Sequence, residues 1–306
     1  MKTAFLFAGQ GAQQVGMGLD FYNAYPLCKD IYDSVKLDFD LKDLCFNGPL
    51  DQLSNTAYTQ ACLLVTCYAI AKALELEGIH ADCLAGLSLG EYSALTYGQA
   101  LSLQDAANLV RQRGQIMTTA MPEGTCGMIA VLSNQHDLIL KLCQDQTVLD
   151  KGICEIANYN SLNQVVVSGD NAALLEFEEL LKQNAIRYKR LNVSGAFHTS
   201  LLKPASLKLK TILETMKFKT PVHPVYMNVS GKPEEDIQTA LIQQLYSSVQ
   251  WIKIIQQMLN DGVDTFIEIG PSKILSGLVR NISPTSTVYS IDSVAALHTL
   301  RGEWHV

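Results

Sequence analysis

The sequence has little charge and no excess of glycine or proline. Charged residues make up 17% of its 306 residues and hydrophobic residues 48%, with 20 glycines and 9 prolines. This composition excludes disordered, low-complexity and collagen-like chains. Basic residues are also few, 23 against 30 acidic ones, which gives a net charge of −7. A globally acidic chain is not typical of a dedicated nucleic-acid binder, so we expect no nucleic-acid partner.

Long hydrophobic runs are missing too. The first apolar stretch, residues 4–9, has six residues and is too short for the core of a signal peptide. The longest helix-like apolar stretch, residues 61–71, has eleven, whereas a membrane-spanning helix needs about 20. We therefore expect a cytoplasmic protein with no membrane partner.

The cysteines lack the spacing of a metal site. None of the eight forms a C-x-x-C pair, and no histidine pair has zinc spacing. Scattered thiols in a chain of this length fit a reducing compartment better than a disulfide framework. We expect most of them to be buried small hydrophobic residues and expect no bound metal.

What is present is a repeated order of strand, turn and helix. The length of the chain, 306 residues, suggests about two domains. Between residues 125 and 193 the predicted order is β-α-β-β-α-β, which is ferredoxin-like. We therefore predict an α/β fold: a large domain with a mostly parallel sheet at 1–124 and 194–306, and an inserted ferredoxin-like domain at 125–193. Strands of the large domain are predicted at 4–8, 83–87, 222–228, 265–269 and 287–291, and its helices at 59–76, 91–101, 102–120, 201–216, 273–281 and twice within 235–261.

The turn at Gly9-Gln10-Gly11 is not a dinucleotide-binding fingerprint. The pattern G-x-G-x-x-G requires glycine at position 14, where this chain has Gln14. A tight turn after a strand can instead aim backbone N–H groups at an anion.

The segment Gly86-Leu87-Ser88-Leu89-Gly90 matches G-x-S-x-G, the nucleophile elbow. An apolar strand precedes it and a predicted helix follows. The two glycines allow a sharp turn that presents the Ser88 hydroxyl above the sheet. The N–H of Leu89, at the helix start, would face an oxyanion.

A nucleophilic serine needs a base, and His198 is the strongest candidate. It follows Phe197 where the predicted insertion returns to the large domain, and clefts form at such junctions. Ordinary α/β-hydrolases carry this histidine near their C-terminus, whereas 108 residues follow His198 here. His223 is the second candidate. The other four are His80 before a strand, His136 at a helix start, and His298 and His305 in the polar tail.

Arg113 lies 25 residues after Ser88 in a helix that is otherwise largely apolar. Burying a guanidinium is costly unless an anion pairs with it. Two interpretations are open: a solvated arginine like Arg111, or a fork for a substrate carboxylate.

Positive charge is concentrated around His198. Nine basic residues and one acidic residue lie between Lys182 and Lys219. The segment is either a solvated helix face or the docking surface of an acidic partner or substrate.

Together, several motifs resemble the malonyl-CoA:acyl carrier protein transacylases of bacterial fatty-acid synthesis. The resemblance covers nearly the whole chain. The motifs are Phe7-Ala8-Gly9-Gln10-Gly11-Ala12-Gln13, Gly86-Leu87-Ser88-Leu89-Gly90-Glu91-Tyr92-Ser93-Ala94, Arg113-Gly114-Gln115-Ile116-Met117, Asn158-Tyr159-Asn160-Ser161, Gln164-Val165-Val166, Phe197-His198, Val249-Gln250-Trp251 and Glu268-Ile269-Gly270-Pro271. The resemblance implies an α/β-hydrolase-like core with a ferredoxin-like insertion.

The resemblance also implies roles for individual residues. Ser88 would carry the acyl group, His198 would be the general base, and Arg113 would hold the malonyl carboxylate. Gln10 and Leu89 would donate their backbone N–H groups to an oxyanion. Gln250 would line the site, and the ring of Phe197 would crowd an α-methyl branch on the acyl group. Leu87 departs from the histidine that many members have before the serine, but its side chain takes no part in the transfer.

The implied reaction is a ping-pong transfer of malonyl from malonyl-CoA to the phosphopantetheine thiol of acyl carrier protein. It needs no metal and no bound cofactor. The acidic carrier is expected to dock near Lys203, Lys208, Lys210, Lys189 and Arg190, and we expect a monomer.

Other functions stay open at this stage. A free-standing acyltransferase serving a polyketide synthase would have the same motifs. A serine hydrolase or thioesterase, with Ser88 paired to Asp261, belongs to another class, and a non-catalytic scaffold to a third.

Overall fold

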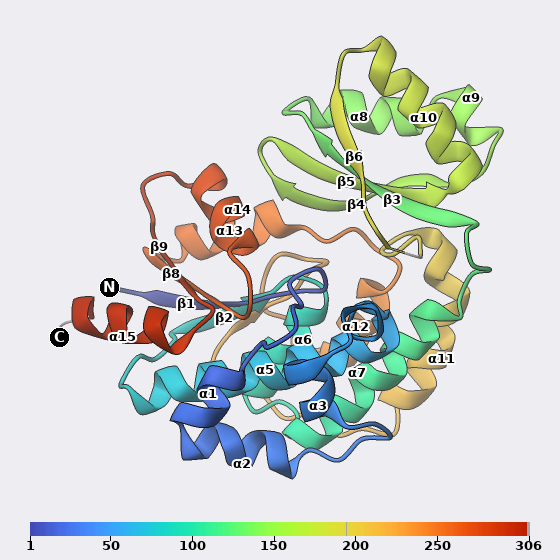
Figure 1. Cartoon of the computed structure of the whole chain (residues 1–306). Coiled ribbons are helices and arrows are strands. Elements are labelled where there is room, and N and C mark those ends of the chain that lie inside the picture. Colours follow the sequence, from blue (N-terminus) through green and yellow to red (C-terminus); the bar gives the residue numbers. More distant parts are fainter. Residues whose placement is uncertain (194, 305–306) are drawn as a thin grey trace.

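Five parallel strands form the central sheet of the larger part, in the order β7-β2-β1-β8-β9. They are β1 (Thr3–Phe7), β2 (Cys83–Gly86), β7 (Val225–Tyr226), β8 (Thr265–Ile269) and β9 (Thr287–Ile291). The structure, a computed structural model, describes residues 1–193 and 195–304, so the candidate His305 lies outside the described residues. Helices lie on both faces of this sheet (Figure 1), as a parallel sheet requires.

The alternation of side chains along β1 shows how the two faces are covered. Phe5 and Phe7 belong to one apolar cluster, and Ala4 and Leu6 belong to another on the opposite face. The second cluster is covered by α13 (Trp251–Asn260) and α14 (Ile274–Ile282), which contribute side chains to it. The helices of the first cluster are α1 (Leu19–Ala24), α2 (Pro26–Ser34), α3 (Leu41–Asn47), α4 (Leu50–Ser54), α5 (Thr56–Leu76), α6 (Leu89–Tyr97), α7 (Leu103–Thr118), α11 (Lys203–Leu213), α12 (Ile237–Gln244) and α15 (Val294–Glu303).

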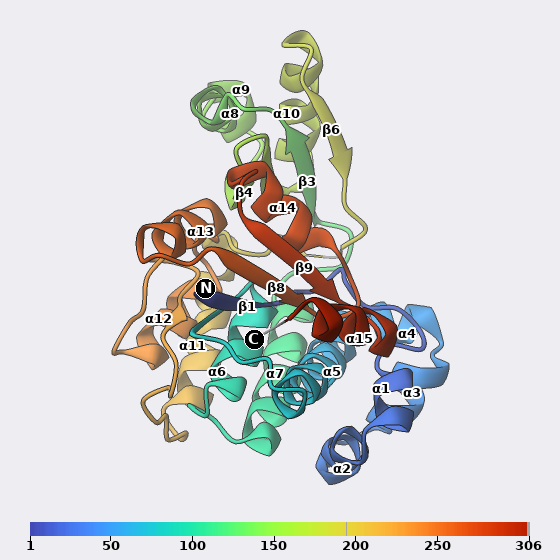
Figure 2. The same ribbon diagram turned by 90° about the vertical axis from the view of Figure 1, so that its left-hand side faces the viewer.

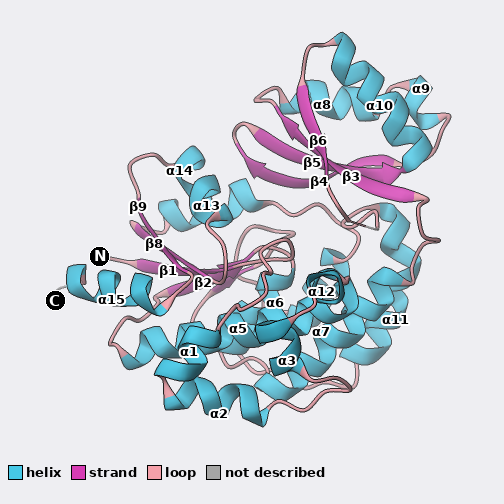
Figure 3. Ribbon diagram, in the orientation of Figure 1, coloured by secondary structure: helices cyan, strands magenta, loops and turns pink. Residues whose placement is uncertain are grey.

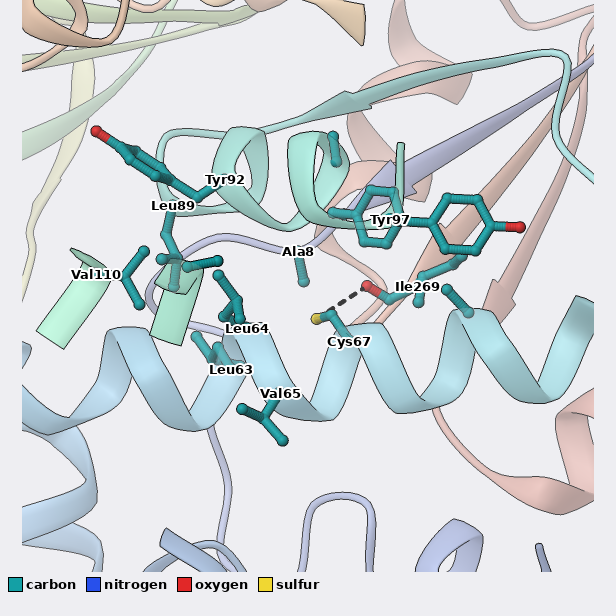
Figure 4. Packing of buried hydrophobic residues seen from close by; sticks show 14 of the residues in the cluster. Ala8, Leu63, Leu64, Val65, Cys67, Leu89, Tyr92, Tyr97, Val110 and Ile269 are labelled. Carbon is teal, nitrogen blue, oxygen red and sulfur yellow. Dashed lines mark hydrogen bonds between the residues drawn. The ribbon is translucent and has the colours of Figure 1, made fainter. Parts of the chain in front are cut away.

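Helix α5 is the centre of the larger cluster. It is long and apolar enough to cross a membrane, which residues 61–71 alone are not, but 78% of its most apolar window is buried inside the fold. Figure 4 shows Leu63, Leu64 and Cys67 of this helix among Ala8, which follows β1, and side chains from α6, α7 and β8. The Cys67 thiol donates to the carbonyl oxygen of Ile269 at 3.4 Å, which ties the helix to β8. All eight cysteines are free and buried, as expected.

The smaller part has its own antiparallel sheet, in the order β4-β5-β3-β6. Its elements are β3 (Cys126–Leu132), α8 (His136–Cys143), α9 (Gln146–Leu149), β4 (Cys154–Ser161), β5 (Gln164–Asp170), α10 (Asn171–Gln183) and β6 (Arg187–Arg190). This order of elements is the predicted β-α-β-β-α-β, with one additional short helix. Figure 3 shows the two sheets as separate sets of strands.

Backbone hydrogen bonds join the larger part to the smaller part. Val249, just before α13, donates its N–H to the Ala157 carbonyl at 2.8 Å and accepts the Tyr159 N–H at 2.9 Å. Strand β4 therefore lies beside α13 and α14 (Figure 2). The division of the chain into domains at residues 124/125 and 193/194 stays a prediction.

Several elements differ from those predicted. The four short helices between residues 19 and 54 were not predicted, and residues 294–303 of the polar tail form the helix α15. Helix α6 begins at Leu89 rather than residue 91, and β7 has two residues rather than seven. Ser102 caps α7, because its hydroxyl accepts the Asp105 N–H at 3.1 Å.

Candidate active site

Ser88 occupies the sharp turn between β2 and α6. Its φ of 54° lies in the left-handed region, which is strained for a residue with a side chain. The neighbouring glycines are required by contact: a Cβ on Gly86 would lie 1.9 Å from the Gly90 carbonyl carbon, and one on Gly90 would lie 2.1 Å from the Phe7 oxygen. The close approach of β2 to α6 at Gly86, and of β1 to Gly90, thus explains the G-x-S-x-G spacing.

The turn after β1 lies directly against this elbow. A Cβ on Gly9 would come within 2.4 Å of the Leu87 carbonyl oxygen. The Gln10 side chain donates to the Thr56 hydroxyl at 2.8 Å, which fixes the turn to α5. The backbone N–H groups of Gln10 and Leu89 donate to no atom of residues 1–193 and 195–304. Two free donors beside the serine hydroxyl can stabilise an oxyanion.

The structure brings Ser88 and His198 together. The Nε2 atom of His198 lies 2.7 Å from the Ser88 Oγ, across 110 residues of sequence. The Nδ1 atom lies 2.8 Å from the backbone oxygen of Gln244. Because a carbonyl only accepts, Nδ1 carries the proton and Nε2 is the acceptor for the serine hydroxyl. This is the geometry of a nucleophile with its base.

His198 is held in its neutral form by its surroundings. It is buried, with φ at 61°. Burial, together with the positive charge of Arg113, lowers its pKa from 6.5 to about 4. Nε2 is therefore unprotonated at neutral pH and is available as a proton acceptor.

Arg113 is a buried cation beside the nucleophile. Its side chain is almost entirely buried, and its guanidinium lies over the Tyr92 ring at 5.0 Å. It donates to the amide oxygens of Gln60 and Gln244 at 2.8 and 2.9 Å. Its Nη2 atom also lies 3.3 Å from the Ser88 Oγ. Arg113 is thus not a solvated arginine, and burial lowers its pKa.

No carboxylate of the described residues forms an ion pair with Arg113. Its Nε atom is buried and has no hydrogen-bond partner within that part of the chain. Nε and Nη2 form one edge of the guanidinium fork, so the edge near Ser88 has an unused donor. A carboxylate placed there would accept two parallel hydrogen bonds.

Gln244, at the end of α12, contacts Ser88, His198 and Arg113. The sequence patterns did not indicate it. Its backbone oxygen orients His198, its Oε1 accepts from Arg113, and its Nε2 donates to the Ser88 carbonyl at 2.8 Å. The resemblance indicates Gln250 as a residue lining the site, but its side chain makes no hydrogen bond to the described residues. Its N–H donates to the Asn228 carbonyl at 2.7 Å. A role for Gln250 in lining the site stays a prediction.

Two further amides were also missed. Gln60 on α5 accepts from Arg113, and Asn228 after β7 accepts the Ser88 N–H at 2.6 Å. Asn228 follows a strand of the parallel sheet, as Ser88 does. Because carboxyl ends of parallel strands meet at one edge, this position was a usable signal.

The remaining candidates make no hydrogen bond to Ser88. Phe197 is buried in the apolar cluster that also holds Met128 and Val166 of the smaller sheet. Asp261 accepts from the Tyr226 hydroxyl at 2.5 Å and makes no hydrogen bond to Ser88. His223 stacks on Tyr97. The serine–aspartate pair of the hydrolase alternative is therefore not formed.

Arg111 is not the solvated arginine that the sequence reasoning took it to be. It donates to both carboxylate oxygens of Asp38 at 2.9 Å and is buried.

The predicted basic docking residues lie on two elements. The exposed face of α11 also carries Leu207, which is 65% exposed. On β6, Arg190 forms an ion pair with Glu178 at 2.7 Å. On α11, Lys210 lies 3.7 Å from Glu214. The exposed lysines among the five are Lys189, Lys203, Lys208 and Lys210.

Comparison with known proteins identifies the family of the chain. Residues 4–299 match the model of the family described as acyl transferase domain. The malonyl CoA-acyl carrier protein transacylase of Bacillus subtilis (strain 168) is 41% identical over 288 residues, 92% of this chain and 90% of that protein.

Solved structures match over the whole fold. The malonyl CoA-acyl carrier protein transacylase of Clostridium perfringens has a TM-score of 0.94 at 38% identity, covering 99% of this chain and 97% of that one. A malonyl-transacylase in complex with a type II PKS acyl-carrier protein has a TM-score of 0.95 at 34% identity, covering 99% and 100%. The chain therefore belongs to the malonyl CoA-acyl carrier protein transacylases, a family of acyltransferases.

Proposed function

We propose that this enzyme transfers the malonyl group of malonyl-CoA to the phosphopantetheine thiol of an acyl carrier protein in fatty-acid biosynthesis. The single observation that carries the proposal is the cluster around the Ser88 Oγ. His198 Nε2 lies 2.7 Å from this atom and Arg113 Nη2 lies 3.3 Å from it. A base and a carboxylate-binding cation thus meet at one nucleophile.

In the first half-reaction, His198 Nε2 takes the proton of the Ser88 hydroxyl. The Oγ atom then attacks the thioester carbonyl, and the oxyanion that forms accepts from the Gln10 and Leu89 N–H groups. The intermediate collapses when the C–S bond breaks. The CoA thiolate leaves with the proton from His198, and malonyl remains on Ser88 as an ester.

Arg113 determines which class of acyl group reacts in this step. Only one methylene separates the ester carbonyl of a malonyl group from its carboxylate, so the carboxylate lies near the edge of the guanidinium that faces Ser88. It would accept from Nη2 and from the unpartnered Nε. A planar fork suits a carboxylate better than a point charge does.

The second half-reaction runs the same chemistry with the carrier thiol. His198 takes the thiol proton, the sulfur attacks the ester carbonyl, and the Ser88 oxygen leaves with that proton. We place the docking of the acidic carrier at the lysines of α11, around the exposed Leu207, and at Lys189 of β6. We further propose that the enzyme is a cytoplasmic monomer.

Intact mass spectrometry tests the proposal. Incubation with malonyl-CoA should add one malonyl group to the protein, and holo acyl carrier protein should then remove it. Ser88→Ala should abolish the adduct. Ser93→Ala, which changes another buried serine of α6, should keep it. An adduct at full stoichiometry on Ser88→Ala would refute the assignment of the nucleophile.

The same experiment separates the other functions. Loss of the adduct to water as fast as to the carrier would indicate a hydrolase, and absence of any adduct would indicate a scaffold. A polyketide carrier is the second candidate partner, since a structurally similar malonyl-transacylase was solved with one. Transfer rates to a fatty-acid carrier and a polyketide carrier, measured side by side, decide between them.

A further inference from the structure

The proposed mechanism leaves unused a buried asparagine that spans the elbow. Asn228 has no exposed surface. Its Oδ1 accepts the Ser88 N–H at 2.6 Å, and its Nδ2 donates to the Gly86 carbonyl at 2.7 Å. One amide side chain therefore joins the backbone on both sides of the turn. An amide has the acceptor and the donor that this bridge needs.

A buried carboxyl group holds Asn228 in turn. The Oε2 atom of Glu91 accepts the Asn228 backbone N–H at 2.5 Å. Glu91 is fully buried, and its Oε1 atom has no hydrogen-bond partner within residues 1–193 and 195–304. Burial raises its pKa to about 8. A buried carboxyl without an ionic partner is costly, and such costs are concentrated at functional sites.

These contacts resemble a helix capping box with one residue inserted. In the usual box, the serine at the N-cap accepts an N–H of the first turn, and the glutamate three residues on accepts the N–H of that serine. Here Ser88 is the N-cap of α6, yet its side chain makes no capping bond. Asn228 accepts the Ser88 N–H, and Glu91 accepts the N–H of Asn228. The Ser88 hydroxyl is thereby left for His198.

We propose that Glu91 and Asn228 are positioning residues that hold Ser88 in its left-handed conformation. Without them, the turn could relax to an ordinary cap in which the Ser88 hydroxyl bonds the backbone of α6 instead of His198. This inference rests on the proposed function, because the atom being positioned is the one that is acylated. Neither residue touches the substrate in this assignment. Each acts through Ser88.

Substitutions that keep or remove single contacts test the proposal. Glu91→Gln retains an oxygen that can accept the Asn228 N–H, whereas Glu91→Ala does not. Asn228→Ala removes both side-chain bonds, and Asn228→Asp keeps the acceptor but loses the donor to Gly86. The readout is the single-turnover rate of Ser88 acylation by malonyl-CoA, with KM and the unfolding temperature measured in parallel.

We expect Glu91→Ala and Asn228→Ala to slow acylation by about 10²-fold, the usual cost of a misplacement near 1 Å. Their KM for malonyl-CoA should not change, and Glu91→Gln should recover most of the rate. The acylation rate of Asn228→Asp should lie between those of the wild type and Asn228→Ala. If Asn228→Ala does not fold, the Asn228→Asp variant takes its place in the test.

Glu268→Gln is the matched control. Glu268 is equally buried, and its carboxylate accepts the N–H groups of Leu275 and Ser276 at 3.1 and 2.7 Å, with no bond to the elbow. Its substitution should lower the unfolding temperature and leave acylation unchanged. Wild-type rates for Glu91→Ala and Asn228→Ala would overturn the inference. An equal loss in Glu91→Gln and Glu91→Ala, or in Glu268→Gln, would also overturn it.

A fluorophosphonate probe, which labels activated serines, separates this inference from the proposed function. If malonyl-CoA does not acylate the wild type, the function fails. The labelling rate of Ser88 then still reports whether Glu91 and Asn228 position it.

Discussion

Arg113→Ala tests whether this guanidinium recognises the carboxylate of the acyl group. Its Nε has no partner among the residues that the structure describes, and its Nη2 is 3.3 Å from the Ser88 Oγ. A carboxylate accepting from both atoms would gain two charge-assisted hydrogen bonds, about 1.5–3 kcal/mol each. The preference for malonyl over acetyl then amounts to about 3–6 kcal/mol, or roughly 10²–10⁴ in kcat/KM.

The quantity to measure is the ratio of kcat/KM for malonyl-CoA and acetyl-CoA. Removing Arg113 also leaves the amide oxygens of Gln60 and Gln244 without their donor, and Gln244 orients His198. That loss slows both substrates alike, so it cancels in the ratio. Arg113→Lys should recover little of the ratio, because an ammonium cannot donate as a fork.

Arg111→Ala is the control for Arg113. Arg111 lies two residues earlier on the same helix and is also buried, but it is paired with Asp38. Its loss should lower stability and leave the malonyl-to-acetyl ratio unchanged. If the ratio in Arg113→Ala equals that of the wild type, the reasoning is refuted, and the carboxylate must be recognised elsewhere.

Four further results are expected. His198→Ala should slow acylation by about 10²–10⁴, while His223→Ala should have almost no effect; the reverse order would reassign the base. Since the pKa of His198 is lowered to about 4, the acylation rate should stay constant as pH falls from about 8 to about 5, and an inflection near the ordinary value of 6.5 would contradict its burial. Between those two pKa values only the unfolded chain is protonated at His198, so the free energy of unfolding should decrease by about 3 kcal/mol as pH falls through this window; denaturant titration measures it. Changing Lys203, Lys208 and Lys210 to Glu should raise the KM for the carrier and leave acylation by malonyl-CoA unchanged, and equal losses in both half-reactions would indicate a folding defect.

The parts of the fold that could be predicted are those with local signals. Runs rich in β-branched and aromatic residues predicted β8 and β9 to the residue, and the glycine spacing around Ser88 predicted the elbow. Some of the short helices before α5 lack such a signal. Helix α4, for example, has five residues and no side-chain cap, so we attribute its stability to packing against α5.

The candidate site could be predicted only in part, for a related reason. Ser88 lies in a local motif and His198 at a predicted junction. Gln244, in contrast, stands in a polar run where Gln243 looks the same, and only the fold brings it to Arg113, 131 residues away. Amide side chains that act through long-range hydrogen bonds leave no periodicity or spacing in the sequence.

The backbone pairing of Val249 with Ala157 and Tyr159 bears on how this enzyme could be recombined with its relatives. Excising the segment that carries β4 would leave the Val249 N–H and carbonyl group unpaired immediately before Gln250 and α13. A chimera that exchanges this segment must therefore preserve its backbone pairing with Val249, as well as the two points where the chain passes between the larger and the smaller part. By this criterion the smaller sheet is not an independent module, and the unit of exchange includes the residues around Val249.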